Sequence, residues 1–189
     1  MKSHASSSPH HSMKMPFRRS RGFTLIELVV TIALATLLMT VAVPSYTAFQ
    51  QNAQLSEATS EFIGAVNTAR GAAMKEGRNT YLVPLDGANW SSGWRVFTDA
   101  NWDQIYTAGT DALVKESPAP NSSVVITTLG LSSLASGYLL FNGSGYPKMK
   151  NGGFAAGTIQ MGNANRTSVI TIDSTGRVRS CNKNTTTCT

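Results

Sequence analysis

The chain has 189 residues, which is enough for one modest globular domain with an appendage and too few for two ordinary domains plus a membrane span. Its formal net charge of +6 sits at the two ends, because five of the 16 lysines and arginines precede Phe23 and six follow residue 144, where Asp173 is the only acid. All three histidines also precede Phe23, which excludes His-dependent catalytic groups and metal sites from the remainder, so we expect no enzyme, cofactor, metal site or small-molecule substrate.

An apolar segment begins at Phe23. From Phe23 to Val43 the only charge is Glu27, and 21 residues are enough for a helix to cross about 30 Å of hydrocarbon. Basic residues cluster before this segment and none follows until Arg70, so the positive-inside rule keeps residues 1–22 in the cytoplasm and exports the chain after Val43.

Glu27 requires an explanation, because a carboxylate inside an apolar segment costs roughly 2.5–3.5 kcal/mol on insertion scales. Such an acid tends to mark a functional pairing, and the alternative is a plain membrane anchor with an incidental glutamate. A second alternative is a secretory signal cleaved after its apolar region, for which "TVAVPSY" (residues 40–46) offers a weak small-residue site.

The stretch "RGFTLIELVVTIALATLLMTVAVPSY" resembles the N-terminus of type IV pilins and pseudopilins. The resemblance implies that a prepilin peptidase removes residues 1–22 as a leader, by cleavage between Gly22 and Phe23, and methylates the new amine of Phe23. It implies that residues 23–43 form an inner-membrane anchor and later the filament core. There Glu27 would pair with the N-terminal amine of a neighbouring subunit, so that a costly charge becomes favourable on assembly. The leader is long for the family, and Met13 or Met15 could be the true start in place of Met1.

Helical periodicity continues beyond Pro44. We expect residues 44–77 to form an amphipathic continuation of the helix, with Pro44 kinking rather than ending it and Gly77 acting as a C-cap. The apolar residues of this part recur at three- and four-residue intervals and should pack on a sheet: Leu55, Ala58, Phe62, Val66, Ala69 and Ala73.

Residues 78–189 have the composition of a β-rich head. Short β-like segments lie at residues 79–85, 93–98, 123–129, 138–142, 157–163, 168–173 and 177–181. "NGSG" (142–145) and "DSTG" (173–176) predict turns, the second joining the last two strands as a hairpin. A long helix followed by many strands predicts an α+β protein, here with a transmembrane N-terminal α-helix packed on an antiparallel sheet, which is the type IV pilin fold.

Three stretches of the head, "GWRVFTDANWD", "LLFNGSGYP" and "ITIDSTGRVRSC", resemble in that order the domain shared by the pseudopilin GspH and the minor pilin FimT. "GRVR" matches the Gly-Arg-x-Arg motif of FimT-like competence pilins, which bind DNA during natural transformation. The resemblance therefore implies DNA binding by Gly176, Arg177 and Arg179. On a strand, Arg177 and Arg179 would share one face and Val178 the other. The alternative is that these arginines protect an exposed edge strand or form salt bridges with the next subunit.

Two cysteines, Cys181 and Cys188, lie close together and predict a small disulfide-closed loop if this end is in an oxidising compartment. Such a loop would hold Lys183 near the two arginines. Charge alone suggests Lys183, Lys148, Lys150 and Arg166 as further DNA contacts.

Two other groups of residues have simpler interpretations. Asp99, Asp103 and Asp111 loosely suggest a calcium loop, but their spacing does not fit an EF-hand and favours a polar loop between strands. Trp90, Trp94 and Trp102 could stack on single-stranded bases, although Trp94 lies in a predicted strand, where core packing is the commoner role.

Together these observations predict a minor type IV pilin, anchored in the bacterial inner membrane with a periplasmic head and then incorporated into a pilus, that binds DNA non-specifically for uptake. Its partners would be other pilins, the prepilin peptidase, the inner membrane and DNA. Two alternatives remain: a GspH-like pseudopilin of a type II secretion system, and a structural minor pilin that primes assembly. The N-terminus cannot separate these three functions, because they share the same anchor.

Overall fold

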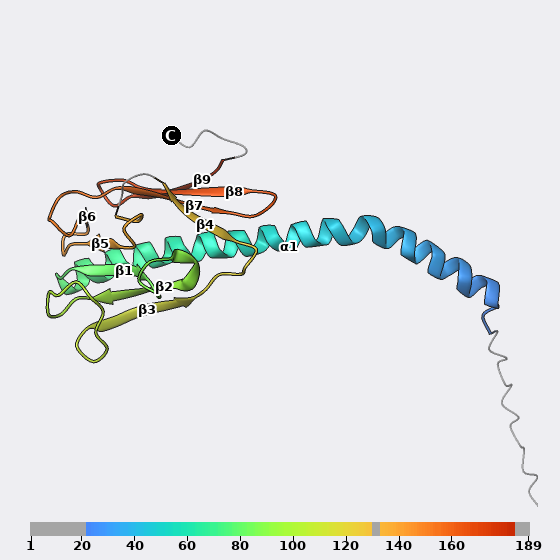
Figure 1. Ribbon diagram of the computed structural model, residues 1–189, viewed down its shortest axis with the longest axis horizontal. Helices are drawn as coiled ribbons and strands as arrows, with labels where there is room; N and C mark the ends of the chain where they lie inside the picture. Colours follow the sequence, from blue (N-terminus) through green and yellow to red (C-terminus); the bar gives the residue numbers. More distant parts are fainter. Residues whose placement is uncertain (1–21, 130–132, 184–189) are drawn as a thin grey trace, which may run out of the picture. The chain divides into compact units, whose positions relative to one another are not determined.

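A computed structural model describes residues 22–129 and 133–183 of the chain (Figure 1). The predicted leader up to residue 21, and Cys188 with its predicted disulfide, lie outside the described residues. The contacts divide the chain into an N-terminal unit that ends at Ala42 and a second unit from Val43, which we call the head.

Helix α1 runs over Leu25–Glu76 and contains Pro44 in its interior, so the predicted continuation beyond Pro44 is confirmed. Gly77 follows the helix with a φ of 64°, the left-handed conformation of the predicted C-cap. The side chains of α1 from Leu25 to Thr40 are exposed, and most of them are apolar. By length and composition, α1 is apolar enough to cross a membrane.

The head contains two antiparallel sheets. The first sheet has the order β3-β2-β1-β5-β6, with β1 (Thr80–Pro84), β2 (Gly93–Thr98), β3 (Ala112–Pro118), β5 (Leu139–Phe141) and β6 (Pro147–Lys148). The second sheet has the order β4-β7-β8-β9, with β4 (Val125–Leu129), β7 (Gly157–Gly162), β8 (Thr167–Ile172) and β9 (Val178–Asn182). A short 3-10 helix, η1 (Trp90–Ser92), precedes β2.

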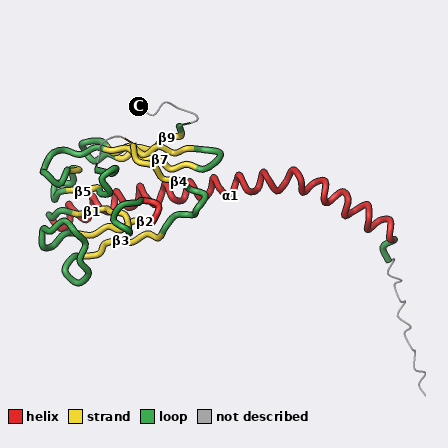
Figure 2. The backbone as a smooth tube through the Cα atoms, viewed as in Figure 1, coloured by secondary structure: helices red, strands yellow, loops and turns green. Residues whose placement is uncertain are grey.

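The head part of α1 packs against both sheets, with β7, β8 and β9 above it and β1, β2 and β3 below it in Figures 1 and 2. All six apolar residues predicted to face a sheet are buried: Leu55, Ala58, Phe62, Val66, Ala69 and Ala73. They share one core with residues of both sheets, including Leu82, Trp94, Val96, Ile159 and Ile170. Alternate residues of the first sheet point away from α1 and form a second, smaller cluster of Tyr81, Phe97 and Leu140.

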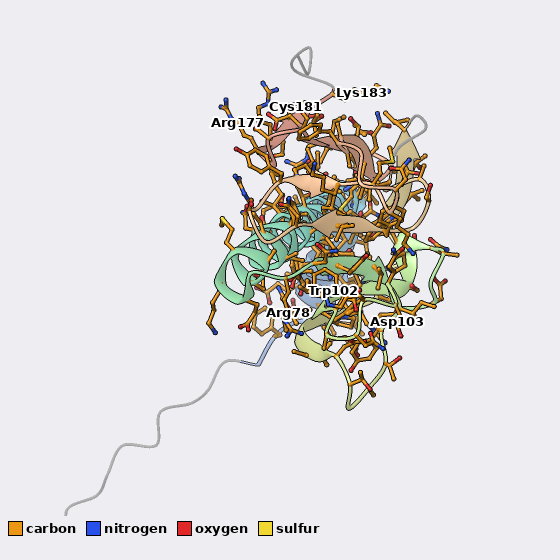
Figure 3. The ribbon with its side chains drawn as sticks, turned by 90° about the vertical axis from the view of Figure 1, so that its left-hand side faces the viewer. Arg78, Trp102, Asp103, Arg177, Cys181 and Lys183 are labelled. Carbon is orange, nitrogen blue, oxygen red and sulfur yellow. The ribbon has the colours of Figure 1, made fainter. Side chains whose placement is uncertain are left out.

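Two of the three tryptophans are core residues rather than exposed stacking platforms. The ring of Phe62 meets the rings of Trp90 and Trp94 edge-on, at centroid distances of 5.5 and 5.3 Å. Trp90 Nε1 donates a 2.9 Å hydrogen bond to the carbonyl oxygen of Leu134. Trp102 alone is exposed, and in Figure 3 it lies on the side of the first sheet, away from Arg177 and Lys183.

Each of the seven predicted strand segments contains a strand, but β3 and β6 were not predicted. β3 occupies the edge of the first sheet and is mostly exposed, so its residues alternate weakly between apolar and polar. β6 consists of two residues at the other edge. Both strands lack the apolar alternation from which the other strands were inferred.

Candidate nucleic-acid interface and assembly residues

The turn between β8 and β9 is organised by Asp173. Its Oδ1 accepts hydrogen bonds from Thr175 Oγ1 (2.6 Å), Thr175 N (2.9 Å) and Arg177 N (3.0 Å). The Asp173 carbonyl accepts from Gly176 N at 2.9 Å, and Asp173 N donates to the carbonyl of Arg177 at 3.1 Å. The predicted hairpin is therefore confirmed, as a tight turn followed by a glycine bulge.

Gly176 has a structural reason for its place in this turn. Its φ is 80°, and a Cβ atom there would lie 2.9 Å from the carbonyl oxygen of Gly145 and 3.3 Å from Phe141 Cε1. The residue is buried, and its own carbonyl accepts a 3.0 Å hydrogen bond from Arg70 Nη1. Gly176 thus positions Arg177 and offers no side chain to a ligand.

The two arginines of the motif are exposed, whereas Val178 between them packs against the core. Arg179 lies opposite Thr171 of β8, which in turn lies opposite Thr158 of β7, so the outer face of the second sheet is polar beside Arg179. In the described part of the chain, β9 has β8 as its only strand neighbour. Arg179 therefore projects from an edge strand, and Arg177 from the turn directly before it.

Lys183 continues this row of cations. It is exposed directly after β9, and its backbone N donates to the carbonyl of Thr167 at 3.0 Å. Figure 3 shows Arg177, Cys181 and Lys183 along the upper rim of the head. Because alternate residues of a strand lie roughly 6.6 Å apart along its axis, Arg177, Arg179 and Lys183 form an extended positive row. We call these three residues the β9 row.

Among the described residues, no member of the β9 row takes part in a salt bridge. The nearest acid in the sequence, Asp173, is ionised at neutral pH. The hydrogen bond from the Thr175 hydroxyl lowers the pKa of Asp173, and the positive charge of Arg179 acts in the same direction. The Asp173 carboxylate accepts the hydrogen bonds of the turn and forms no salt bridge with Arg177 or Arg179, so these two guanidinium groups can bind an external anion.

The other cations suggested by charge alone are placed elsewhere. Arg166 Nη2 donates a 2.6 Å hydrogen bond to Ser56 Oγ and so ties the β7–β8 loop to α1. Lys148 lies 3.9 Å from the ring centre of Phe154, and Lys150 lies 5.1 Å from that of Tyr138, both at the edge of the first sheet. They do not join the β9 row.

The three aspartates of the β2–β3 loop hold the loop together. Asp99 accepts hydrogen bonds from Trp102 N at 2.7 Å and from Gln104 N at 3.1 Å. Trp102 and Gln104 are the two non-glycine residues with positive φ in the described chain. Asp111 accepts from Ala100 N (3.0 Å) and from the N of Thr107 (2.7 Å). These bonds support the interpretation of a polar loop.

At the start of α1, Thr24 and Glu27 form a capping box. Thr24 N and Thr24 Oγ1 donate to Glu27 Oε2 at 3.1 and 3.0 Å, and Glu27 N donates to Thr24 Oγ1 at 3.3 Å. This capping role was not predicted from the sequence, although the T-x-x-E spacing is its signature. Phe23, the predicted new N-terminus, is exposed beside it.

Two family models match the chain. Residues 58–176 match "Type II transport protein GspH", and residues 17–43 match the "Prokaryotic N-terminal methylation motif". The second match contains Gly22, Phe23 and Glu27.

Two curated fimbrial proteins of Pseudomonas aeruginosa are each 36% identical to the chain over 61 residues. The match covers 32% of this chain and 39% of each relative, so the chain spans about two fifths of the length of the curated relatives it matches.

Among solved structures, two crystal forms of the type IV minor pilin FimU of Pseudomonas aeruginosa PAO1 share the fold. The first superposes with a TM-score of 0.52 at 16% identity, covering 69% of this chain and 90% of FimU. The second gives a TM-score of 0.50 at 14% identity, covering 67% and 91%. The predicted α+β fold of the type IV pilin class is therefore confirmed.

Proposed function

The chain belongs to the GspH family of pilin-like proteins, and we propose that it is a minor type IV pilin whose β9 row binds DNA during uptake. Membership, together with the N-terminal methylation motif, implies processing by a prepilin peptidase and assembly with other pilins. The observation that carries the DNA proposal is the row itself: three exposed cations on and directly beside one edge strand, with no salt bridge among the described residues.

We place leader cleavage between Gly22 and Phe23 and methylation at the amine of Phe23. The methylation-motif match and the membrane-compatible length of α1 support this placement. Glu27 would then pair with the amine of a neighbouring subunit in the filament. Residues 23–43 would anchor the protein in the inner membrane, with the head in the periplasm, until assembly.

The β9 row predicts binding of a particular kind. Contacts to phosphates carry no sequence information, so the affinity should be equal for duplexes of different sequence. Three phosphate contacts predict a slope of about −2.7 when the logarithm of the binding constant is plotted against the logarithm of salt concentration. So few contacts give weak binding, and useful retention of DNA would need several copies or neighbouring basic pilins.

The test uses the full chain in a non-ionic detergent and a fluorescent duplex, titrated at several salt concentrations. The variant Arg177→Gln with Arg179→Gln should bind more weakly, and its salt slope should be shallower by about 1.8. A matched control, Lys75→Gln with Lys115→Gln, removes two exposed or half-exposed charges outside the row and should keep the slope. If the arginine variant binds like the wild type, the DNA proposal is wrong.

A second candidate function is that of a pseudopilin in a type II secretion system, which the description of the matched family favours. A pseudopilin need not contact DNA. Deletion of the gene separates the two functions: loss of transformation with normal protein export supports the uptake pilin, and loss of export supports the pseudopilin. A third outcome would indicate a purely structural minor pilin. In that case the deletion strain loses its pili, and the Arg177→Gln, Arg179→Gln variant restores both pili and transformation in full.

A further inference from the structure

Two adjoining cavities lie on the face of the first sheet that points away from α1. Their volumes are about 390 and 250 Å³, and both are lined by Gln104 and Lys150, which makes them two lobes of one depression. The larger lobe is bounded by β1, β2 and the β2–β3 loop, and the smaller lobe by β1, β5 and β6. No residue of the β9 row lines either lobe, whereas Lys148 and Lys150, which charge alone suggested as DNA contacts, do.

The larger lobe is aromatic. The rings of Phe97, Tyr106 and Tyr138 line it, and the guanidinium of Arg95 lies 4.7 Å from the ring centre of Tyr106. Arg95 also forms a 3.4 Å salt bridge with Glu116, but its Nε is buried and donates to no atom of the described residues. The lobe therefore offers aromatic surface, and its wall contains a buried hydrogen-bond donor without a partner.

The wall of the smaller lobe contains a buried hydroxyl without a partner. Tyr81 is only 1% exposed, and its Oη has no hydrogen-bond partner among the described residues. Burial raises the pKa of Tyr81 to about 12, with a further contribution from Asp99, so the hydroxyl keeps its proton and can donate it to an acceptor. A buried polar group without a partner is costly, and a bound acceptor would satisfy this one.

Two lysines give the smaller lobe its charge. Lys148 and Lys150 line it, and neither takes part in a salt bridge among the described residues. The carboxylates nearby are engaged in local hydrogen bonds: Asp86 accepts from Ala88 N and Asn89 N, at 2.9 and 2.7 Å, and Asp103 accepts from Ile105 N at 2.9 Å. Of the described residues, Lys148 and Lys150 are the only charged ones that line this lobe, so its lining is positive, and the Asp99 and Asp103 carboxylates lie close enough to act on Tyr81.

We propose that this depression binds one nucleotide of a single-stranded nucleic acid, with its phosphate at Lys148, Lys150 and the Tyr81 hydroxyl and its base in the aromatic lobe. A nucleotide joins an anion to a planar ring that carries hydrogen-bond acceptors, which matches the two lobes and the buried Arg95 Nε. Bases bind aromatic side chains without regard to sequence, because every base has a π-face. A paired base in a duplex is stacked and cannot enter.

This inference rests on the proposed function, since it gives a pilin that takes up DNA a second site of contact with that DNA. The two sites are connected through two turns that touch, and Asn142 of the first of these turns lines the smaller lobe. The β5–β6 turn touches the β8–β9 turn, because a Cβ atom at Gly176 would lie 2.9 Å from the carbonyl oxygen of Gly145. Lys148 follows Gly145 by three residues, on β6, and Arg177 follows Gly176 directly.

The test compares single-stranded dT oligonucleotides with duplexes of the same length, using the full chain in a non-ionic detergent and fluorescence anisotropy at fixed salt. The wild type should prefer the single strand. Lys148→Gln with Lys150→Gln should weaken single-strand binding by about tenfold and duplex binding by less than about twofold. The control Lys75→Gln with Lys115→Gln removes the same charge outside the lobes and should not change the preference.

Arg177→Gln with Arg179→Gln should weaken binding of the single strand and of the duplex equally. The proposals of the nucleotide site and of the β9 row can therefore fail independently. An unchanged single-strand preference in the lysine variant overturns the nucleotide site and leaves the β9 row intact. The converse result, with only the lysine variant impaired, overturns the β9 row and supports the nucleotide site. No binding of either form by the wild type overturns both.

A competition experiment tests the base and the class of ligand. An abasic oligonucleotide should compete with dT at least about fivefold less well than unlabelled dT, because it lacks the ring for the aromatic lobe. Equal competition by the abasic strand overturns the assignment of the aromatic lobe. Stronger competition by a short peptide with a free C-terminal carboxylate overturns the nucleotide assignment in favour of a protein ligand.

Discussion

Arg70 Nη1 donates a 3.0 Å hydrogen bond to the carbonyl oxygen of Gly176, joining α1 to the turn that precedes Arg177. The two residues are 106 positions apart, and the Arg70 side chain also lies close to where a Cβ atom of Gly176 would be. The bond is partly buried, so the carbonyl has little access to water if the arginine is removed. The position of the β9 row therefore depends on a residue of the helix.

Replacing Arg70 by alanine should destabilise the head by about 1–3 kcal/mol, because it leaves a half-buried carbonyl without a donor. Urea unfolding of the full chain in detergent, followed by tryptophan fluorescence, measures this loss. Arg78→Ala is the matched control, since Arg78 Nη1 donates at 3.1 Å to the exposed carbonyl of Ala100, where water can substitute. Equal losses for the two variants would contradict the argument from burial.

Gly176→Ala should cost more than the strain of a positive φ alone. The added Cβ would also meet backbone and ring atoms closer than 3.4 Å, so the β5–β6 turn or the hairpin has to move. Gly87→Ala is the control, because Gly87 has the same φ of 80° and open space around the added atom. We expect about 1 kcal/mol for Gly87→Ala and about 3 kcal/mol for Gly176→Ala, measured by urea unfolding.

The same substitution should affect the β9 row. Displacement of the turn would move Arg177 relative to Arg179, so Gly176→Ala should also weaken duplex binding in conditions where the head remains folded. Gly87→Ala should bind duplex DNA like the wild type. Unchanged binding by a folded Gly176→Ala chain would show that the spacing of the two arginines is not important.

Much of the head follows from local patterns in the sequence. The helical stripe from Leu55 to Ala73 was predicted because apolar residues at three- and four-residue intervals must share one face. The β8–β9 hairpin was predicted from "DSTG", since Asp at the first position and Gly at the last suit this turn.

Other features could not be read from the sequence because they depend on long-range contacts. The bond between Arg70 and Gly176, and the meeting of the β5–β6 and β8–β9 turns, arise only after the sheets have packed on the helix. The two-lobed depression combines residues from four strands and several loops, none of which forms a motif alone. β3 was missed because an edge strand buries too little to enforce an apolar alternation.

The Asp173 turn should make the hairpin sensitive to acid. The pKa of Asp173 is lowered in the folded protein, chiefly by the Thr175 hydroxyl, so the turn contributes stability above the unfolded pKa and loses it as the pH falls through the folded pKa. Asp173→Asn should therefore be less stable than the wild type at pH 7, and the difference should shrink toward pH 2. Urea unfolding at several pH values measures it, and a difference independent of pH would contradict the prediction.

The capping box at the start of α1 gives Glu27 a partner within its own chain, in addition to the amine of a neighbour that we propose for the filament. Thr24→Ser keeps the hydroxyl and should leave the amount of protein in sheared filaments unchanged. Thr24→Val removes the side-chain bonds, frays the first turn at a cost of about 1 kcal/mol and should lower incorporation. Glu27→Gln should lower incorporation most, because neither Thr24 nor the amine of the neighbouring subunit then has a carboxylate to pair with. Leader removal should continue in this variant, as judged by mass spectrometry. If Thr24→Val and Glu27→Gln assemble equally well, the neighbour's amine adds nothing beyond the capping box, and the proposed pairing between subunits is wrong.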